Sequence, residues 1–198
     1  MNITGILLAA GHSRRFTHGN KLLYPLQAGQ PTALVSARNL IAALPHCLAV
    51  VRPGASELAT LMEKAGLEVL ACQPHEQEMA DSLAAAVRHV VFQHSPPDAI
   101  VIALADMPFI LPETIAAVAQ KLAEGANIVA PTYQGLRGHP VGFSKRFYAE
   151  LATLTGDEGA RSVLRRHVED IQLMECDDPG ILQDFDTWEE LQRLLPKS

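Results

Sequence analysis

The apolar positions of this chain fall into short, nearly continuous runs, separated by longer stretches in which apolar and polar residues recur with helical spacing. The apolar runs predict strands buried on both faces, and they occupy residues 3–9, 47–51, 67–71, 99–105 and 127–130. The stretches between them predict helices over residues 32–44, 56–66, 79–94 and 112–125. Pro112 fits the first turn of the last of these helices, and Gly125 fits the position just after its end.

This alternation of strand and helix predicts a three-layer α/β fold with a mostly parallel, doubly wound sheet of the Rossmann-like type. The last third departs from simple alternation. It predicts an extended segment, two helical segments, a short strand and a final helix, at residues 138–143, 145–154, 157–167, 170–175 and from about 187. No linker rich in Gly, Ser or Pro separates these parts, so we expect a single domain over residues 1–198.

Composition and charge narrow the classes of function. Apolar residues make up 48% of the 198 positions and charged residues 19%, which is typical of a compact globular protein. The net charge of -6 argues against a general nucleic-acid-binding surface. The N-terminal apolar run is too short to cross a bilayer and lacks the basic start of a signal peptide. We therefore expect a cytoplasmic protein with neither nucleic acid nor membrane as its partner.

Ligands of doubly wound sheets bind beyond the carboxyl ends of the strands, and the first such end carries the segment "AAGHSRRFTHGNK" (9–21). Gly11 permits a sharp turn that brings backbone amides close to an anion, and Arg14, Arg15 and Lys21 add positive charge. The spacing matches neither the dinucleotide fingerprint nor the Walker loop. The pattern predicts a phosphate-binding loop, with a solvated loop carrying incidental charges as the alternative.

Two acidic residues suggest a metal site. Asp106, in "LADMP", directly follows a buried strand, where one carboxylate can hold Mg²⁺ together with phosphate oxygens; a turn or helix cap is the alternative. In "DFDTWEEL", Thr187 and Glu190 have the spacing of a capping box. Asp186 is then either a second metal ligand or a solvated acid favoured by the helix dipole.

Two further segments carry candidate contacts. In "GLRGHPVGF", His139 stands between Gly138 and Pro140, a constrained setting for a side chain that donates or accepts a hydrogen bond. A metal-ligand role for this histidine is disfavoured because no second histidine lies at ligand spacing. "GDEGAR" (156–161) most simply predicts a helix start with Asp157 as N-cap and Arg161 in the first turns, with substrate contact as the alternative.

In this order, the segments "LAAGHSRRF…K", "MADSL", "LADMP", "GLRGHPVGF", "GDEGAR" and "DFDTWEEL" resemble the MobA-like nucleotidyltransferases, most of all the molybdenum cofactor cytidylyltransferase branch. The resemblance implies a GT-A nucleotide-diphospho-sugar transferase type of fold and dependence on Mg²⁺. It also implies transfer of a nucleoside monophosphate from a nucleoside triphosphate to a phosphorylated acceptor, with release of pyrophosphate.

The resemblance also assigns residues by position. Catalysis would depend on Arg15, Lys21 and Asp106, and the metal would be held by Asp106 and Asp186. The acceptor would contact Gly138, His139 and Pro140. The nucleotide would be bound by Ala9, Ala10, Gly11, Ser13, Arg15 and Lys21 on the triphosphate side and by Ser82 and Leu83 on the nucleobase side.

Ala10 favours CTP over GTP, because guanylyl-transferring relatives tend to have glycine at that position. The implied partners are CTP or another triphosphate, a molybdopterin-type cofactor, and a molybdoenzyme or insertion chaperone that receives the product. The chain departs from the family pattern at Thr17, Glu78 and Trp188, and its stretch before Lys21 is one residue longer. A guanylyltransferase, an enzyme for another phosphorylated acceptor, and a non-catalytic cofactor-binding chaperone remain as alternatives.

Overall fold

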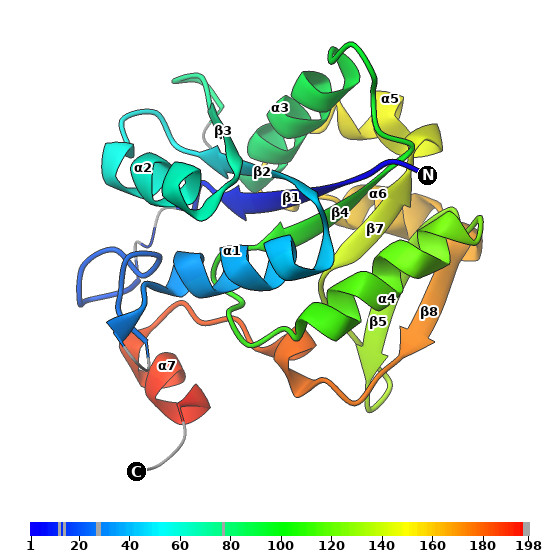
Figure 1. Ribbon diagram of the computed structural model, residues 1–198. Coiled ribbons are helices and arrows are strands. Elements are labelled where there is room, and N and C mark those ends of the chain that lie inside the picture. Colours follow the sequence, from blue (N-terminus) through cyan, green and yellow to red (C-terminus); the bar gives the residue numbers. More distant parts are fainter. Residues whose placement is uncertain (12, 14, 27–28, 77, 196–198) are drawn as a thin grey trace.

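The computed structural model describes residues 1–11, 13, 15–26, 29–76 and 78–195. Within these residues one mixed sheet has the strand order β3-β2-β1-β4-β7-β5-β6, with β8 paired to β5 (Figure 1). Its strands are β1 (Ile3–Ala9), β2 (His46–Val51), β3 (Glu68–Ala71), β4 (Ala99–Leu104), β5 (Ile128–Tyr133), β6 (Leu136–Arg137), β7 (Val141–Ser144) and β8 (Ile171–Glu175). Most of the strands run parallel, and β7 and β6 are antiparallel to their neighbours. The predicted α/β class with a mostly parallel, doubly wound sheet is confirmed.

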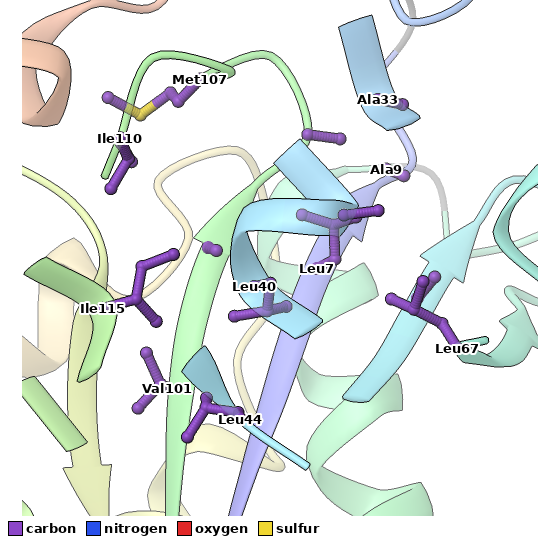
Figure 2. Close-up of a cluster of buried hydrophobic side chains, with 14 of the residues drawn as sticks. Leu7, Ala9, Ala33, Leu40, Leu44, Leu67, Val101, Met107, Ile110 and Ile115 are labelled. Atoms are coloured by element: carbon purple, nitrogen blue, oxygen red, sulfur yellow. The ribbon is translucent and has the colours of Figure 1, made fainter. Parts of the chain in front are cut away.

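Helices cover both faces of the sheet (Figure 1). One face packs against α1 (Thr32–Ala43), α2 (Ser56–Ala65) and α4 (Pro112–Ala123). The other packs against α3 (Met79–Val91), α5 (Tyr148–Leu151) and α6 (Arg161–Arg166). Figure 2 shows Leu40 of α1 lying over Leu7 of β1. Gly5 allows this close approach, because a Cβ atom there would lie 3.0 Å from the Leu40 side chain.

The last third is less regular than its pattern predicts. The segment 145–154 forms a 3-10 turn (Lys145–Phe147) followed by α5. The predicted helix over 157–167 begins only at Arg161, with Ala160 as its N-cap residue, so the expected cap at Asp157 is wrong. Gly156 and Gly159 adopt positive φ angles of 90° and 56°. Because left-handed residues interrupt a right-handed helix, these two glycines delay its start.

After β8 the chain returns to the carboxyl edge of the sheet through a 3-10 turn, Pro179–Leu182. Asp178 anchors this return, because its buried carboxylate accepts hydrogen bonds from the Leu111 amide at 2.9 Å, the Thr114 hydroxyl at 2.7 Å and the Gly180 amide at 2.9 Å. A Cβ atom on Gly180 would lie 2.1 Å from the Phe109 carbonyl oxygen. This contact places the C-terminal segment against the loop that follows β4.

The chain ends in α7 (Trp188–Leu194), which begins with the predicted capping box. The Thr187 hydroxyl accepts from the Glu190 amide at 3.2 Å, and the Glu190 carboxylate accepts from the amides of Thr187 and Asp186 at 3.0 and 2.8 Å. No helix in the described ranges is long and apolar enough to cross a membrane.

Removal of this cap gives a measurable change in stability. Thr187→Ala is expected to lower the free energy of unfolding by about 1 kcal/mol, because an amide at the start of α7 loses its acceptor. Urea denaturation measures the change. Gln192→Ala, an exposed substitution in the same helix, is the matched control and should change stability by less than about 0.5 kcal/mol. Equal effects of the two substitutions would contradict a stabilising cap.

Candidate active site

The loop after β1 folds back on itself. Ser13 has a φ of 49°, in the left-handed region, and its carbonyl oxygen accepts from the Phe16 amide at 3.1 Å. Asn20 closes the other end, because its side-chain oxygen accepts from the Leu22 amide at 3.0 Å and from the Ser13 hydroxyl at 3.4 Å. Turns of this kind can aim backbone amides at an anion. Arg14, predicted to add positive charge here, lies outside the described residues.

Lys21 lies at the centre of the site, with only 6% of its side chain exposed. Its Nζ atom donates to Asp106 Oδ2 at 2.7 Å, to Asp186 Oδ1 at 2.7 Å and to the Phe185 carbonyl oxygen at 3.0 Å. Burial alone would lower the pKa of Lys21, but the adjacent Asp106 and Asp186 carboxylates outweigh it and raise this pKa above its ordinary value. The ammonium group is therefore charged, and it joins three distant parts of the chain.

Asp186 also pairs with Arg15, whose side chain is 72% exposed. Burial works to raise the pKa of Asp186, but the hydrogen bond and charge of Lys21, together with Arg15, lower it below its ordinary value. Asp184 differs, because burial and the charge of Asp106 raise its pKa. Two carboxylates, of Asp106 and Asp186, thus contact the buried ammonium group directly, and Asp184 lies nearby without a hydrogen bond to it among the described residues.

Two pockets meet at these carboxylates. The first, of about 350 Å³, is lined by Ala10, Gly11, Ser13, Arg15, Lys21 and Ser82, among others. The second, of about 460 Å³, is lined by Leu83, Arg137, Gly138, His139 and Arg161, among others. Asp106, Asp157 and Asp186 line both. The site therefore offers two compartments that share one acidic junction.

The structure separates some of the predicted residues from the pockets. Ala9 is buried in the core, and Pro140 lines neither pocket. Leu83, predicted beside the nucleobase, lines the second pocket and not the first, because it follows Ser82 on α3 and points to the other side. Ser82 donates its hydroxyl to the Glu78 carbonyl oxygen at 3.1 Å. The other predicted site residues line one pocket or both.

Two residues at the site, Arg137 and Asp184, escape reasoning from sequence. Asp157 lies at the junction of the pockets, in the segment for which the sequence left substrate contact open as the alternative to a helix cap. Arg137 belongs to the β5–β6 hairpin. Asp184 is two residues before Asp186 in "DFD". This additional aspartate is the one signal in the sequence that could have indicated an acidic cluster larger than Asp106 and Asp186.

An aromatic cluster holds the loop before Lys21 against α7. The Phe16 and Phe185 rings have centroids 6.0 Å apart, and Trp188 lies 4.6 Å from His18 and 5.1 Å from Tyr24. Trp188 and the longer loop are both departures from the family pattern, and here they contact each other. Despite the longer loop, Lys21 lies within hydrogen-bonding distance of both carboxylates.

Asp106 is the carboxylate of the site best placed to bind a magnesium ion. Mg²⁺ is usually held by one or two carboxylates, with phosphate and water supplying the remaining oxygens. Asp106 and Asp186 retain 22% and 33% side-chain exposure, and among the described residues Oδ1 of Asp106 has no hydrogen-bond donor. No group of three or more metal-binding side chains converges in these ranges. Oδ1 of Asp106 is therefore open to a metal ion, whereas both oxygens of Asp186 are paired, Oδ1 with Lys21 and Oδ2 with Arg15.

Comparison with known proteins gives a consistent result. The model of the MobA-like NTP transferase domain matches residues 5–171. Purine catabolism protein PucB of Bacillus subtilis is 30% identical, over 95% of this chain and 93% of its own. Nicotine blue oxidoreductase of Paenarthrobacter nicotinovorans is 29% identical, over 98% and 96%. The crystal structure of Rv0371c from Mycobacterium tuberculosis superposes with a TM-score of 0.83 at 26% identity, over 98% of both chains, and another structure of Rv0371c contains manganese.

Proposed function

The chain belongs to the MobA-like NTP transferase family and is a nucleotidyltransferase, and from this premise we propose that it transfers CMP from CTP to the phosphate of a molybdopterin-type cofactor. The reaction releases pyrophosphate and uses Mg²⁺ held by Asp106 and Asp186. It takes place in the cytoplasm, in a single domain over residues 1–198. A molybdoenzyme or an insertion chaperone receives the product.

The observation that carries this proposal is the buried Lys21–Asp106–Asp186 cluster at the junction of two pockets. A transferase with two substrates needs two compartments that meet where the bond is made. In the proposal the first pocket holds the triphosphate, near Gly11, Ser13 and Arg15, and the second holds the acceptor. Ala10 lines the first pocket. By the family resemblance described above, alanine at this position favours CTP over GTP.

The proposed reaction is an in-line displacement. An oxygen of the acceptor phosphate bonds to the α-phosphorus of CTP, and the bond to the β-phosphate oxygen breaks, so that pyrophosphate leaves with the electron pair. The acceptor is already anionic near neutral pH, so the protein needs no strong base and acts by positioning and charge stabilisation. Lys21 and Arg15 offset the growing negative charge. Bound Mg²⁺ supplies further charge at the phosphates.

Nucleotide preference is measured directly by thermal unfolding with each of the four triphosphates and Mg²⁺. A ligand at 100 times its Kd stabilises the folded protein by about 2.7 kcal/mol, so CTP should give the largest rise in Tm. A pyrophosphate-release assay with molybdopterin then measures turnover. Equal stabilisation by all four triphosphates, or a larger shift with GTP, would contradict cytidylyl transfer and favour the alternative transferases.

The non-catalytic alternative gives a different result in the same assays. A cofactor-binding chaperone would bind a pterin ligand without a divalent metal and would release no pyrophosphate from any triphosphate. The buried Lys21 ammonium, which makes three hydrogen bonds, supports the catalytic function.

A further inference from the structure

Two arginines line the second pocket but not the first. Arg137 lies on β6 and Arg161 begins α6, so they come from separate parts of the chain. Both residues are exposed, and neither forms an ion pair with another described residue. By contrast, Arg165 and Arg166 of the same helix pair with Glu158 and Glu150. The second pocket thus has two guanidinium groups free to bind an anion.

His139 lines the second pocket together with these arginines. The pKa of His139 is lowered to about 4, mainly by burial; the charge of Asp106 works to raise this pKa, and the charges of Arg161 and Arg137 work to lower it. All three charged groups are therefore near the ring. Its Nδ1 atom is buried and has no hydrogen-bond partner among the described residues. The ring has a hydrogen bond with the Ile102 backbone, but an unpaired buried nitrogen is costly, and a donor group on a ligand in the second pocket would offset that cost.

Most of the acidic residues of the second pocket lie at one end. Asp106, Asp157 and Asp186 lie at the junction with the first pocket, whereas Arg137, Arg161 and one further carboxylate, Asp184, line only the second. Glu158, also in this wall, is already paired with Arg165. An anionic acceptor that approaches the junction meets repulsion from the carboxylates and from the α-phosphate. Two cations on the acceptor's side offset that repulsion.

We propose that Arg137 and Arg161 bind the phosphate of the acceptor and that His139 Nδ1 accepts a hydrogen bond from a donor group elsewhere on the same molecule. This inference rests on the proposed function, because it assumes that the second substrate is a phosphomonoester. Guanidinium groups bind phosphate oxygens through paired, charge-assisted hydrogen bonds. The two arginines thus select acceptors that carry a phosphate, and His139 selects among them by their remaining structure.

The test uses a fluorescent phosphomonoester, 6-hydroxymethylpterin phosphate, and the same pterin alcohol without the phosphate. Fluorescence anisotropy measures the Kd of each ligand for the full chain with no triphosphate present. The wild-type protein should bind the ester at least about tenfold more tightly than the alcohol. Arg137→Gln and Arg161→Gln should each raise the Kd of the ester by about tenfold and leave the Kd of the alcohol unchanged.

Arg166→Gln is the matched control, because Arg166 lies on the same helix and pairs with Glu150 outside the pocket; it should bind both ligands as the wild type does. Arg161→Lys keeps the positive charge but loses the paired N–H donors of the guanidinium group. Its Kd for the ester should therefore lie between those of the wild type and Arg161→Gln. Circular dichroism shows whether each variant is folded. Equal binding of ester and alcohol by the wild type, or an unchanged Kd in both glutamine variants, would overturn the inference.

Failure of the proposed function is distinguishable from failure of this inference. If the ester binds through the two arginines but no triphosphate releases pyrophosphate, the phosphate site stands and the transfer reaction is refuted. If pyrophosphate is released normally by the glutamine variants at low acceptor concentration, the transfer reaction stands and the arginines have no role in binding the acceptor.

Discussion

Asp106→Asn is expected to reduce the rate of pyrophosphate release by about 10²-fold or more, which is typical of losing one preorganised group that stabilises charge. The substitution keeps the size of the side chain but removes the negative charge that faces Lys21 at 2.7 Å and that, in the proposed function, holds Mg²⁺. The loss should appear in kcat, because the charge acts when the α-phosphate reacts.

Asp177→Asn is the control for this experiment. Asp177 is exposed and lies outside both pockets, so its substitution should leave turnover unchanged. Both variants are compared with the wild type at saturating triphosphate and over a range of Mg²⁺ concentrations. A folded Asp106→Asn protein that releases pyrophosphate at the normal rate would show that Asp106 has no part in the reaction.

Lys21→Met should have the second large effect, on stability as well as on activity. Removing one partner from a buried ion pair typically costs about 3 kcal/mol of unfolding free energy, because the remaining charges lose their compensation. Here the methionine would leave Asp106 and Asp186 facing each other. Turnover should fall with the loss of the same charge, and urea denaturation measures the loss of stability.

The pH dependence of that loss has a definite sign. The pKa of Asp186 is lowered in the folded protein, so its stabilisation is present above its unfolded pKa and disappears as the pH falls through the folded value. The pKa of Lys21 is raised, so its stabilisation is complete below 10.5 and disappears as the pH rises through the folded value. The difference in stability between wild type and Lys21→Met should therefore be largest between these limits and decrease at either extreme.

Lys121→Met provides the comparison. Lys121 pairs with Glu124 on the exposed side of α4, and such pairs contribute less than about 1 kcal/mol. Its substitution should change stability little at any pH and should leave turnover intact. If Lys21→Met behaves in the same way, the buried ammonium group is not a central element of the site.

The regular part of the fold is predictable because each element carries its own signal. The apolar runs of β1 and β4 can be buried only between two layers of helices, and Pro112 indicates the start of α4 correctly. The last third is less predictable because its path depends on contacts between distant residues. Asp178 anchors a turn to Leu111 and Thr114, and nothing in the local pattern of either segment indicates this contact.

The candidate site shows the same difference between residues with a local sequence signal and residues positioned by contacts with distant parts of the chain. The carboxyl ends of β1 and β4 are neighbours because these strands pair in parallel, so reasoning from strand ends places Lys21's loop near Asp106. Asp186 follows no strand, and it approaches them only because the C-terminal segment folds back. Its own pattern leaves a metal role and a solvated helix start equally open, and only the family resemblance favours the metal role.

The contact between α7 and the loop before Lys21 also gives the protein an optical property. Trp188 is the only tryptophan of the chain, and its indole ring packs against His18, Tyr24 and Phe16. The indole emission of this protein therefore originates at one place, the aromatic cluster behind the loop that bears Arg15 and Lys21. A change of this emission on addition of a triphosphate with Mg²⁺ is the expected signal of binding at that loop, with the wild-type residue as the probe.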